Sequence, residues 1–169
     1  MSLTWIFILW ANSKNLLKLE VQNEQLNDLA SRDTLTGVYL FSAFKEKAQQ
    51  LLDTRPEKFA VVYTDFSDFK YINDVFGYDY GDLLLSQYGK LLLKGLHEYE
   101  LCGRVSADNF VLLLHYNEKS EIAARQADAD YEILRFMHTA HDGQMLPTNC
   151  GICCIEDVIE SLTIDGLLD

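Results

Sequence analysis

The stretch Thr64–Asp82, TDFSDFKYINDVFGYDYGD, decides how this chain folds. It follows an apolar run, Phe59–Tyr63, which predicts a buried strand. Asp65 therefore lies at the carboxyl end of a strand, where its side chain can reach a cleft without being buried. A new helix is predicted to open at Gly81. The passage between strand and helix is rich in carboxylates and includes a lysine and an amide, which suits a metal and an anionic ligand.

Three separate stretches of the chain carry a family resemblance. The first combines Asp65, Phe69-Lys70, Ile72-Asn73-Asp74, Gly77 and Gly81-Asp82, which closely resemble the run D-x-D-x-F-K-x-I-N-D-x-x-G-H-x-x-G-D. That run is typical of GGDEF domains, the diguanylate cyclase family, which this chain resembles. Asp33–Gly37 resembles the family's opening D-x-L-T-G, and Arg104–Phe110 occupies the place of its R-x-G-G-D-E-F signature.

Composition limits the classes of partner. With 169 residues, the chain has room for one domain and an appendage. A formal net charge of −12 argues against a nucleic-acid backbone or an anionic membrane surface as a partner. Four cysteines in a chain of this size do not indicate a disulfide framework, which favours a reducing compartment. Cys150 and Cys153 invite a redox or zinc interpretation, but small core residues are the preferred one.

Residues 1–11 are apolar but too short to span a bilayer. They are interpreted as the cytoplasmic end of a transmembrane helix or a cloning remnant, and a helix packing on the domain is the alternative. Trp5 and Trp10 bracket aliphatic residues as in an interfacial belt, which favours the membrane interpretation. The parent protein would then hold this domain on the cytoplasmic side of the inner membrane, whereas the fragment itself is expected to be soluble.

Residues 12–32 are predicted to form a helical signalling linker. Apolar positions and one asparagine recur at three-four spacing over about two heptads: Leu16, Leu19, Asn23, Leu26 and Ala30. This seam permits a homodimer through the helix, and a single helix lying on its own domain remains the alternative. In the resembled family, such a helix commonly links a sensor to the catalytic domain.

The order of predicted elements indicates an α+β fold with a ferredoxin-like antiparallel sheet flanked by helices. Ser42 is expected to cap a helix before the first strand. The later elements are a helix Gly81–Leu96, strands Glu100–Val105 and Phe110–Tyr116, a helix Glu118–His141 with Ile122, Ala129, Ile133, Phe136 and Met137 toward the core, a strand Pro147–Ile155, and the start of a helix at Thr163–Asp169. The resemblance implies the same palm-like arrangement for a GGDEF-like domain over residues 33–169, which is expected to be truncated at its C-terminus.

The resemblance also implies roles for individual residues. Asp65 and Asp108 would be metal-binding carboxylates, with the Phe66 carbonyl as a further ligand. Hard oxygen donors and phosphates would select magnesium.

The nucleotide in that family is GTP. By resemblance, Asn73 and Asp82 would hydrogen-bond the guanine edge, and Lys70 would lie near the phosphates.

The signature itself departs from the family pattern. Where the family has G-G-D-E-F, this chain reads Ser106-Ala107-Asp108-Asn109-Phe110. Serine and alanine cannot match the backbone freedom of a glycine pair at a tight turn without strain. Asn109 replaces an acidic group with a neutral amide at the reacting centre, and Tyr78 stands where the family usually has histidine. We therefore expect Ser106–Asn109 to be only a hairpin turn, with no catalytic residue assigned to it.

A second motif of the resembled family is also incomplete in this chain. The product-inhibition motif R-x-x-D falls at His97–Glu100, where the arginine that would contact phosphate is absent. The histidines His115, His138 and His141 have no ligand-like spacing in the sequence.

Three functions are compatible with these observations. The preferred one is a catalytically silent, GTP-binding regulatory domain in cyclic di-GMP signalling, with a following EAL phosphodiesterase domain as its partner in a larger protein. The second is an active diguanylate cyclase that makes cyclic di-GMP from two GTP molecules. The third is a structural dimerisation module without a ligand.

Overall fold

The computed structural model describes residues 3–55, 58–140, 148–154, 156 and 164 of the chain. Two compact units are present, Met1–Arg32 and Asp33–Asp169. The predicted final helix at Thr163–Asp169 lies outside the described residues, except for Ile164.

The first unit is a single helix, α1 (Leu3–Ala30), which includes the helix predicted from Asn12 onward. Its leucines from Leu16 onward are exposed, with 61% of Leu19 and 64% of Leu26 accessible to solvent. After the last turn, the side chain of Arg32 donates a hydrogen bond to Asp28 over 3.0 Å. Within the described part of the chain, no helix combines the length and apolar character needed to cross a membrane.

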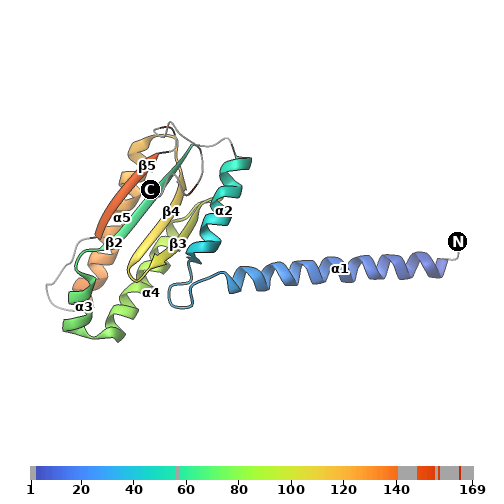
Figure 1. Cartoon of the computed structure of the whole chain (residues 1–169), viewed down its shortest axis with the longest axis horizontal. Coiled ribbons are helices and arrows are strands. Elements are labelled where there is room, and N and C mark those ends of the chain that lie inside the picture. The colour runs from blue at the N-terminus through green and yellow to red at the C-terminus, as the bar shows by residue number, and fades with distance from the viewer. Residues whose placement is uncertain (1–2, 56–57, 141–147, 155, 157–163, 165–169) are drawn as a thin grey trace. The chain divides into compact units, whose positions relative to one another are not determined.

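The second unit is a five-stranded sheet with helices on both faces (Figure 1). Its elements are β1 (Tyr39–Leu40), α2 (Phe41–Thr54), β2 (Phe59–Phe66), α3 (Phe69–Phe76), α4 (Tyr78–Gly95), β3 (Leu101–Ser106), β4 (Asn109–His115), α5 (Lys119–Ala140) and β5 (Thr148–Cys154). The strand order is β1-β3-β4-β2-β5, and all neighbours are antiparallel except the short β1–β3 pair. The predicted α+β, ferredoxin-like arrangement is confirmed.

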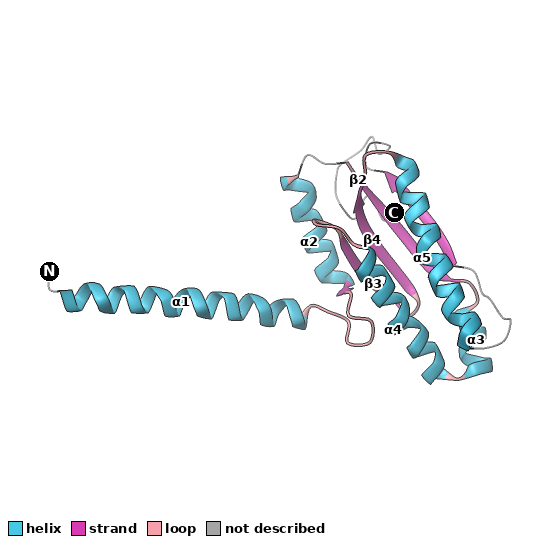
Figure 2. Ribbon diagram, turned by 180° about the vertical axis from the view of Figure 1, so that it is seen from behind, coloured by secondary structure: helices cyan, strands magenta, loops and turns pink. Residues whose placement is uncertain are grey.

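The alternation of side chains along β2 builds two cores. Val62 and Phe66 face α4 and α5, which cross one side of the sheet (Figure 2). Phe59 and Val61 point the other way and pack with Phe44 of α2. The helix α5 contributes the five residues predicted for it, of which Ile122, Ile133 and Met137 are buried and Ala129 and Phe136 are partly buried.

A polar connection crosses the larger core. The Thr64 hydroxyl lies 3.1 Å from the Tyr88 hydroxyl, and Gln126 donates a hydrogen bond to the same Tyr88 oxygen over 3.3 Å. Burial raises the pKa of Tyr88 to about 12, so this phenol stays neutral. These bonds join β2, α4 and α5 directly beneath the strand end that carries Asp65.

Two local predictions about helix starts are wrong. Ser42 does not cap α2: the helix begins at Phe41, immediately after the β1 residue Leu40, and its N-terminus has no side-chain capping bond. The helix predicted to begin at Gly81 starts three residues earlier, at Tyr78.

The short helix α3 departs from the sequence pattern, in which Asn73-Asp74 and Gly77 break the apolar periodicity. Gly77 instead ends α3 with a φ of +86°, and its amide donates a hydrogen bond to the Asn73 carbonyl over 3.0 Å.

The cysteines divide into two kinds. Cys102 and Cys154 are buried, as expected for small core residues, whereas Cys150 is exposed and Cys153 is half-buried. All four thiols are free. The prediction of a core position is therefore wrong for Cys150.

Candidate functional site

The end of β2 and the β3–β4 turn bring two carboxylates together. Thr64 pairs with Phe110 in the antiparallel register, so the turn containing Asp108 lies beside Asp65 and Phe66. Burial and the negative charge of Asp65 raise the pKa of Asp108, although a hydrogen bond from the Phe66 amide partly opposes the shift. Two carboxylates that repel each other at a half-buried sheet edge would be stabilised by a cation between them.

Two further residues belong to this face of the sheet. Tyr63 lies two positions before Asp65 on the same side of β2, and burial together with the charges of Asp65 and Asp108 raises the pKa of its phenol. Asn149 of β5 pairs directly with Asp65, which places its side chain on the same face. Sequence reasoning missed both, although the two-residue period of a strand was a sufficient signal for Tyr63.

The turn carries backbone strain at one residue. Ala107 has a φ of +40°, a conformation that side chains other than glycine rarely adopt. Its carbonyl accepts two hydrogen bonds from Arg104, at 2.8 Å from Nε and 2.6 Å from Nη2. Arg104 thereby holds the strained turn in place from within its own hairpin.

Arg104 also connects this turn to the start of the domain. Its Nη1 atom lies 2.9 Å from Asp33 Oδ1, and that oxygen also accepts hydrogen bonds from the Thr36 amide and hydroxyl. Burial raises the pKa of Asp33, but the bonds from Thr36 and Arg104 outweigh it and lower the pKa below its ordinary value. Thr36 packs against Gly89 of α4, where an added Cβ would meet the Thr36 carbonyl at 2.6 Å.

The helix pair α3–α4 brings the proposed guanine-reading residues together. A Cβ added at Gly81 would clash with Asn73 Oδ1, so the Asn73 amide lies directly against the first turn of α4. Asp82 follows Gly81 and is exposed, whereas Asn73 is half-buried. Lys70 is exposed on the first turn of α3.

The predicted site residues thus form two groups. Asp65, Phe66 and Asp108 meet at the strand end, and Asn73 and Asp82 meet at the α3–α4 junction. The connection between the groups runs through Asp68, whose φ of +54° turns the chain sharply into α3.

The opposite end of the β3–β4 hairpin holds a second polar cluster. Both oxygens of Glu100 receive hydrogen bonds from Arg125, at 2.7 and 2.6 Å, and the amides of His97 and His115 add bonds of 2.7 and 3.1 Å. Although burial raises the pKa of Glu100, these bonds hold it below its ordinary value. The hairpin brings His115, whose spacing in the sequence is not ligand-like, close to His97 and Glu100.

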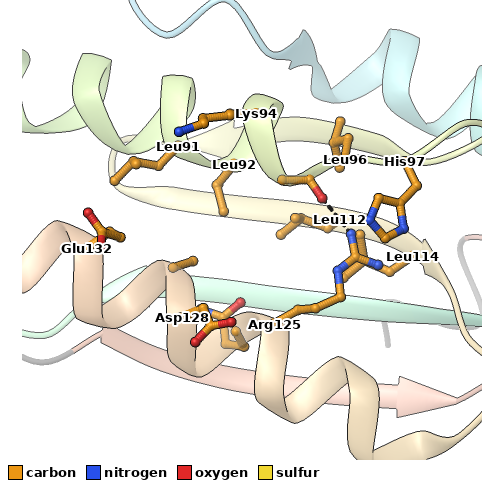
Figure 3. Close-up of a pocket in the computed structure, with 13 residues that line it drawn as sticks. Leu91, Leu92, Lys94, Leu96, His97, Leu112, Leu114, Arg125, Asp128 and Glu132 are labelled. Atoms are coloured by element: carbon orange, nitrogen blue, oxygen red, sulfur yellow. Dashed lines mark hydrogen bonds between the residues drawn. The ribbon is translucent and has the colours of Figure 1, made fainter.

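A cavity of about 330 Å³ lies beside this cluster, between α4 and α5. Figure 3 shows His97 and Arg125 at one end of the cavity and Glu132 at the other. Arg125 also donates to the Gly95 carbonyl over 2.7 Å, which ties the end of α4 to α5.

Comparison with known proteins decides the family. Residues 30–163 match the family described as "Diguanylate cyclase, GGDEF domain". The chain belongs to the GGDEF domain family. The resemblance carried by the three sequence motifs is confirmed, and the chain is a GGDEF domain of the cyclic di-GMP signalling proteins.

Curated relatives of this GGDEF domain are longer than the chain itself. The "Uncharacterized protein YhcK" of Bacillus subtilis is 34% identical over 121 residues, which cover 69% of this chain and 32% of that protein. The "Bifunctional diguanylate cyclase/cyclic di-GMP phosphodiesterase MucR" of Pseudomonas aeruginosa is 32% identical over 104 residues, covering 60% of this chain and 15% of that protein. The chain therefore spans about a third or less of these relatives.

A solved structure shares the fold. Diguanylate cyclase SiaD of Pseudomonas aeruginosa, crystallised in complex with its activator SiaC, matches the GGDEF domain described here with a TM-score of 0.74. The two are 20% identical, and the match covers 89% of this chain and 60% of SiaD.

Proposed function

We propose that this GGDEF domain binds a guanine nucleotide with a divalent cation, does not condense it to cyclic di-GMP, and regulates a larger signalling protein. One observation carries the proposal: the carboxylates Asp65 and Asp108 are placed together, while Asn109 and Ala107 stand where the family has an acid and a glycine. The metal-binding half of the site is thus kept and its reacting half is altered.

The residues at the strand end fit a hard divalent cation. Asp65 and Asp108 supply carboxylate oxygens, and the Phe66 carbonyl is the further candidate ligand. The repulsion that raises the pKa of Asp108 would be relieved by positive charge at this point. When bound, Mg²⁺ would neutralise charge on a triphosphate. Lys70, exposed at the start of α3, is the candidate cationic contact to the phosphates.

The α3–α4 junction supports recognition of guanine. Asn73 is held against Gly81 and so presents its amide in a fixed place, while the Asp82 carboxylate next to it remains exposed. A carboxylate that accepts two N–H groups suits guanine, whose edge carries adjacent donors that adenine lacks.

The altered turn supports the absence of catalysis. Asn109 is neutral, so it can neither share a metal's charge nor accept a proton from an attacking hydroxyl. The Ala107 carbonyl is fixed by Arg104, and its methyl group occupies the side of the turn where a glycine leaves space.

A regulatory role is supported by the contact between the turn and the first residue of the domain. Arg104 joins the Ala107 carbonyl to Asp33, which lies three residues after α1 ends at Ala30. Nucleotide binding at Asp108 would therefore favour one arrangement of the segment that leaves the linker helix. The shift can be no larger than the difference in nucleotide affinity between the two arrangements. By analogy with the bifunctional relative, the regulated partner would be an EAL phosphodiesterase domain, and the exposed leucines of α1 would support a homodimer.

The second candidate function is an active diguanylate cyclase. The positive φ of Ala107 favours it, because the turn keeps a backbone conformation that a glycine would adopt. An enzyme of this kind would have to catalyse the reaction with the carboxylates of Asp65 and Asp108 alone, without an acidic residue at position 109.

Calorimetry of the chain with GTP and ATP, each with Mg²⁺, tests the proposal. We expect GTP to bind more tightly than ATP, and Asp82→Ala or Asn73→Ala to weaken GTP binding by roughly 1–3 kcal/mol. Asp79→Ala is the matched control, since it removes an exposed acid from the same turn of α4. Equal affinity for GTP and ATP would contradict the guanine assignment.

Chromatography of the same mixtures separates the two candidate functions. We expect no cyclic di-GMP after prolonged incubation with Mg²⁺ or Mn²⁺. Sustained turnover that Asp65→Ala abolishes would establish the cyclase instead. In the full-length protein, the phosphodiesterase rate should change with GTP concentration, and a flat response would remove the regulatory claim.

A further inference from the structure

The hairpin end opposite the signature turn brings two imidazoles to one carboxylate. Leu101 pairs with Leu113, which places the residues before β3 beside the end of β4. His115 Nδ1 lies 3.6 Å and His97 Nδ1 lies 4.0 Å from Glu100 Oε1, and ligand atoms of all three residues lie within 4.8 Å of one another. The two imidazole rings meet edge to face, with centroids 6.0 Å apart and planes inclined at 60°.

We propose that His97, Glu100 and His115 form a binding site for a transition-metal ion of the Zn²⁺ class, separate from the nucleotide site. Two imidazole nitrogens, one carboxylate oxygen and a water would complete a four-coordinate site. Nitrogen and oxygen ligands on a tetrahedral zinc ion lie about 3.3 Å apart, given bonds of about 2.0 Å. Small rotations of the two histidine side chains, without backbone movement, would close the distances of 3.6 and 4.0 Å to this value.

The burial of the three groups suits ion entry and ligand positioning. The Glu100 side chain is fully buried and immobilised, whereas 62% of the His97 side chain and 35% of the His115 side chain are exposed. An ion can therefore arrive from solvent on the histidine side and find the carboxylate already oriented. Arg125 would orient this metal ligand, because it donates a hydrogen bond to each Glu100 oxygen and so fixes the direction of the carboxylate.

The charge of the cluster selects against Mg²⁺. Arg125 balances the charge of Glu100, so a hard cation would find little net attraction and only one oxygen ligand. An ion that bonds covalently to imidazole gains two nitrogen ligands at the same place. The two metal sites of the domain are thus chemically distinct, with oxygen ligands at Asp65 and mixed nitrogen and oxygen ligands at the far end of the hairpin.

Zinc titration of the full chain, in the presence of excess Mg²⁺, tests the site. We expect one Zn²⁺ per chain, with an affinity that falls roughly tenfold or more in both His97→Ala and His115→Ala. His138→Ala is the matched control, because it removes an exposed histidine of α5 and should leave the affinity unchanged. Unchanged affinity in the double histidine variant would overturn the proposal.

Two further measurements test whether cysteine thiolates bind the ion and whether the His97→Ala variant still folds. Co²⁺ in place of Zn²⁺ should give visible absorption bands without a thiolate charge-transfer band, and Cys150→Ser should leave them unchanged. A spectrum dominated by thiolate would overturn the assignment. Zn²⁺ should raise the melting temperature of the wild type but not of His97→Ala, whose exposed side chain can be removed without disturbing the core.

Discussion

The two ends of the β3–β4 hairpin both pair an arginine with a carboxylate, but they shift the pKa of an acidic side chain in opposite directions. At one end, Glu100 is buried, receives four hydrogen bonds and has a lowered pKa. At the other end, Asp108 is half-buried beside Asp65 and has a raised pKa. A buried carboxylate that is paired with an arginine and hydrogen-bonded stabilises the fold. A carboxylate beside a second carboxylate lacks such a partner, which is a feature typical of functional sites.

The largest expected effect is loss of stability from Arg125→Ala. The substitution leaves the buried Glu100 carboxylate without its cation, which should lower the free energy of unfolding by about 3–5 kcal/mol. Urea denaturation measures the loss. Arg104→Ala, which breaks the partly buried pair with Asp33, should cost less, because the Asp33 carboxylate keeps 19% of its surface in solvent whereas that of Glu100 is fully buried. An equal or larger loss for Arg104→Ala would remove the distinction between the two ends.

The next effect concerns ligand binding. Removing one of the facing acids by Asp65→Ala should weaken Mg²⁺-dependent GTP binding by about 2 kcal/mol, or some thirtyfold in Kd. Glu132→Ala removes an exposed acid at the rim of the cavity near the other end and should not change GTP affinity. The comparison fails if both variants bind GTP like the wild type.

The strain at the turn predicts a smaller gain in stability. Ala107→Gly should raise the free energy of unfolding by about 1 kcal/mol, because glycine adopts the positive φ without a steric penalty. Ser106→Gly is the matched control: Ser106 lies in β3 and does not have a positive φ, so glycine there should be neutral or destabilising. Thermal or urea unfolding of both variants would refute the assignment of strain if Ser106→Gly were the more stable one.

The smallest expected effect is a difference between the two ends of the hairpin in how their acidic groups change the free energy of unfolding with pH. The raised pKa of Asp108 means that its favourable contribution is present below the ordinary value of 3.8 and is lost as the pH rises through the folded value. Asp108→Asn should therefore stabilise the metal-free protein at neutral pH, by less than about 1 kcal/mol, and have no effect near pH 3. Unfolding curves across this range, without divalent cations, provide the measurement.

The lowered pKa of Glu100 has the opposite sign. Its contribution is present above the ordinary value of 4.5 and is lost as the pH falls through the folded value. The wild type should therefore lose stability on acidification even where Asp108→Asn no longer matters. A profile that stays flat from neutral pH down to the folded value would contradict this account of the buried pair.

Strand alternation and motif spacing were sufficient to predict the sheet and the meeting of Asp65 with the turn. The order of elements leaves few topologies, and the predicted hairpin at Ser106–Asn109 fixes which strand ends meet. The helix α3 escaped prediction because eight residues carry too little periodicity to outweigh the glycine and polar pair within the stretch.

Side-chain contacts between distant residues were beyond sequence reasoning. His97 and His115 are adjacent only because of the strand register, which a one-residue slip would destroy. The loss of both signature glycines predicted strain, but only Ala107 needs a positive φ, since Ser106 continues the strand. Which of two lost glycines matters depends on backbone angles that the sequence alone does not contain.

The geometry of the turn at Ala107 bears on how easily such a domain could change its role over generations. An alanine codon becomes a glycine codon by a single base change, and the backbone already has the conformation that glycine would take. Asparagine at position 109 likewise becomes aspartate by one base change. Because Arg104 holds the turn of the hairpin in place, these two substitutions would require no change in the backbone around them. A domain with this turn stays only a few mutational steps from an acidic, glycine-containing turn.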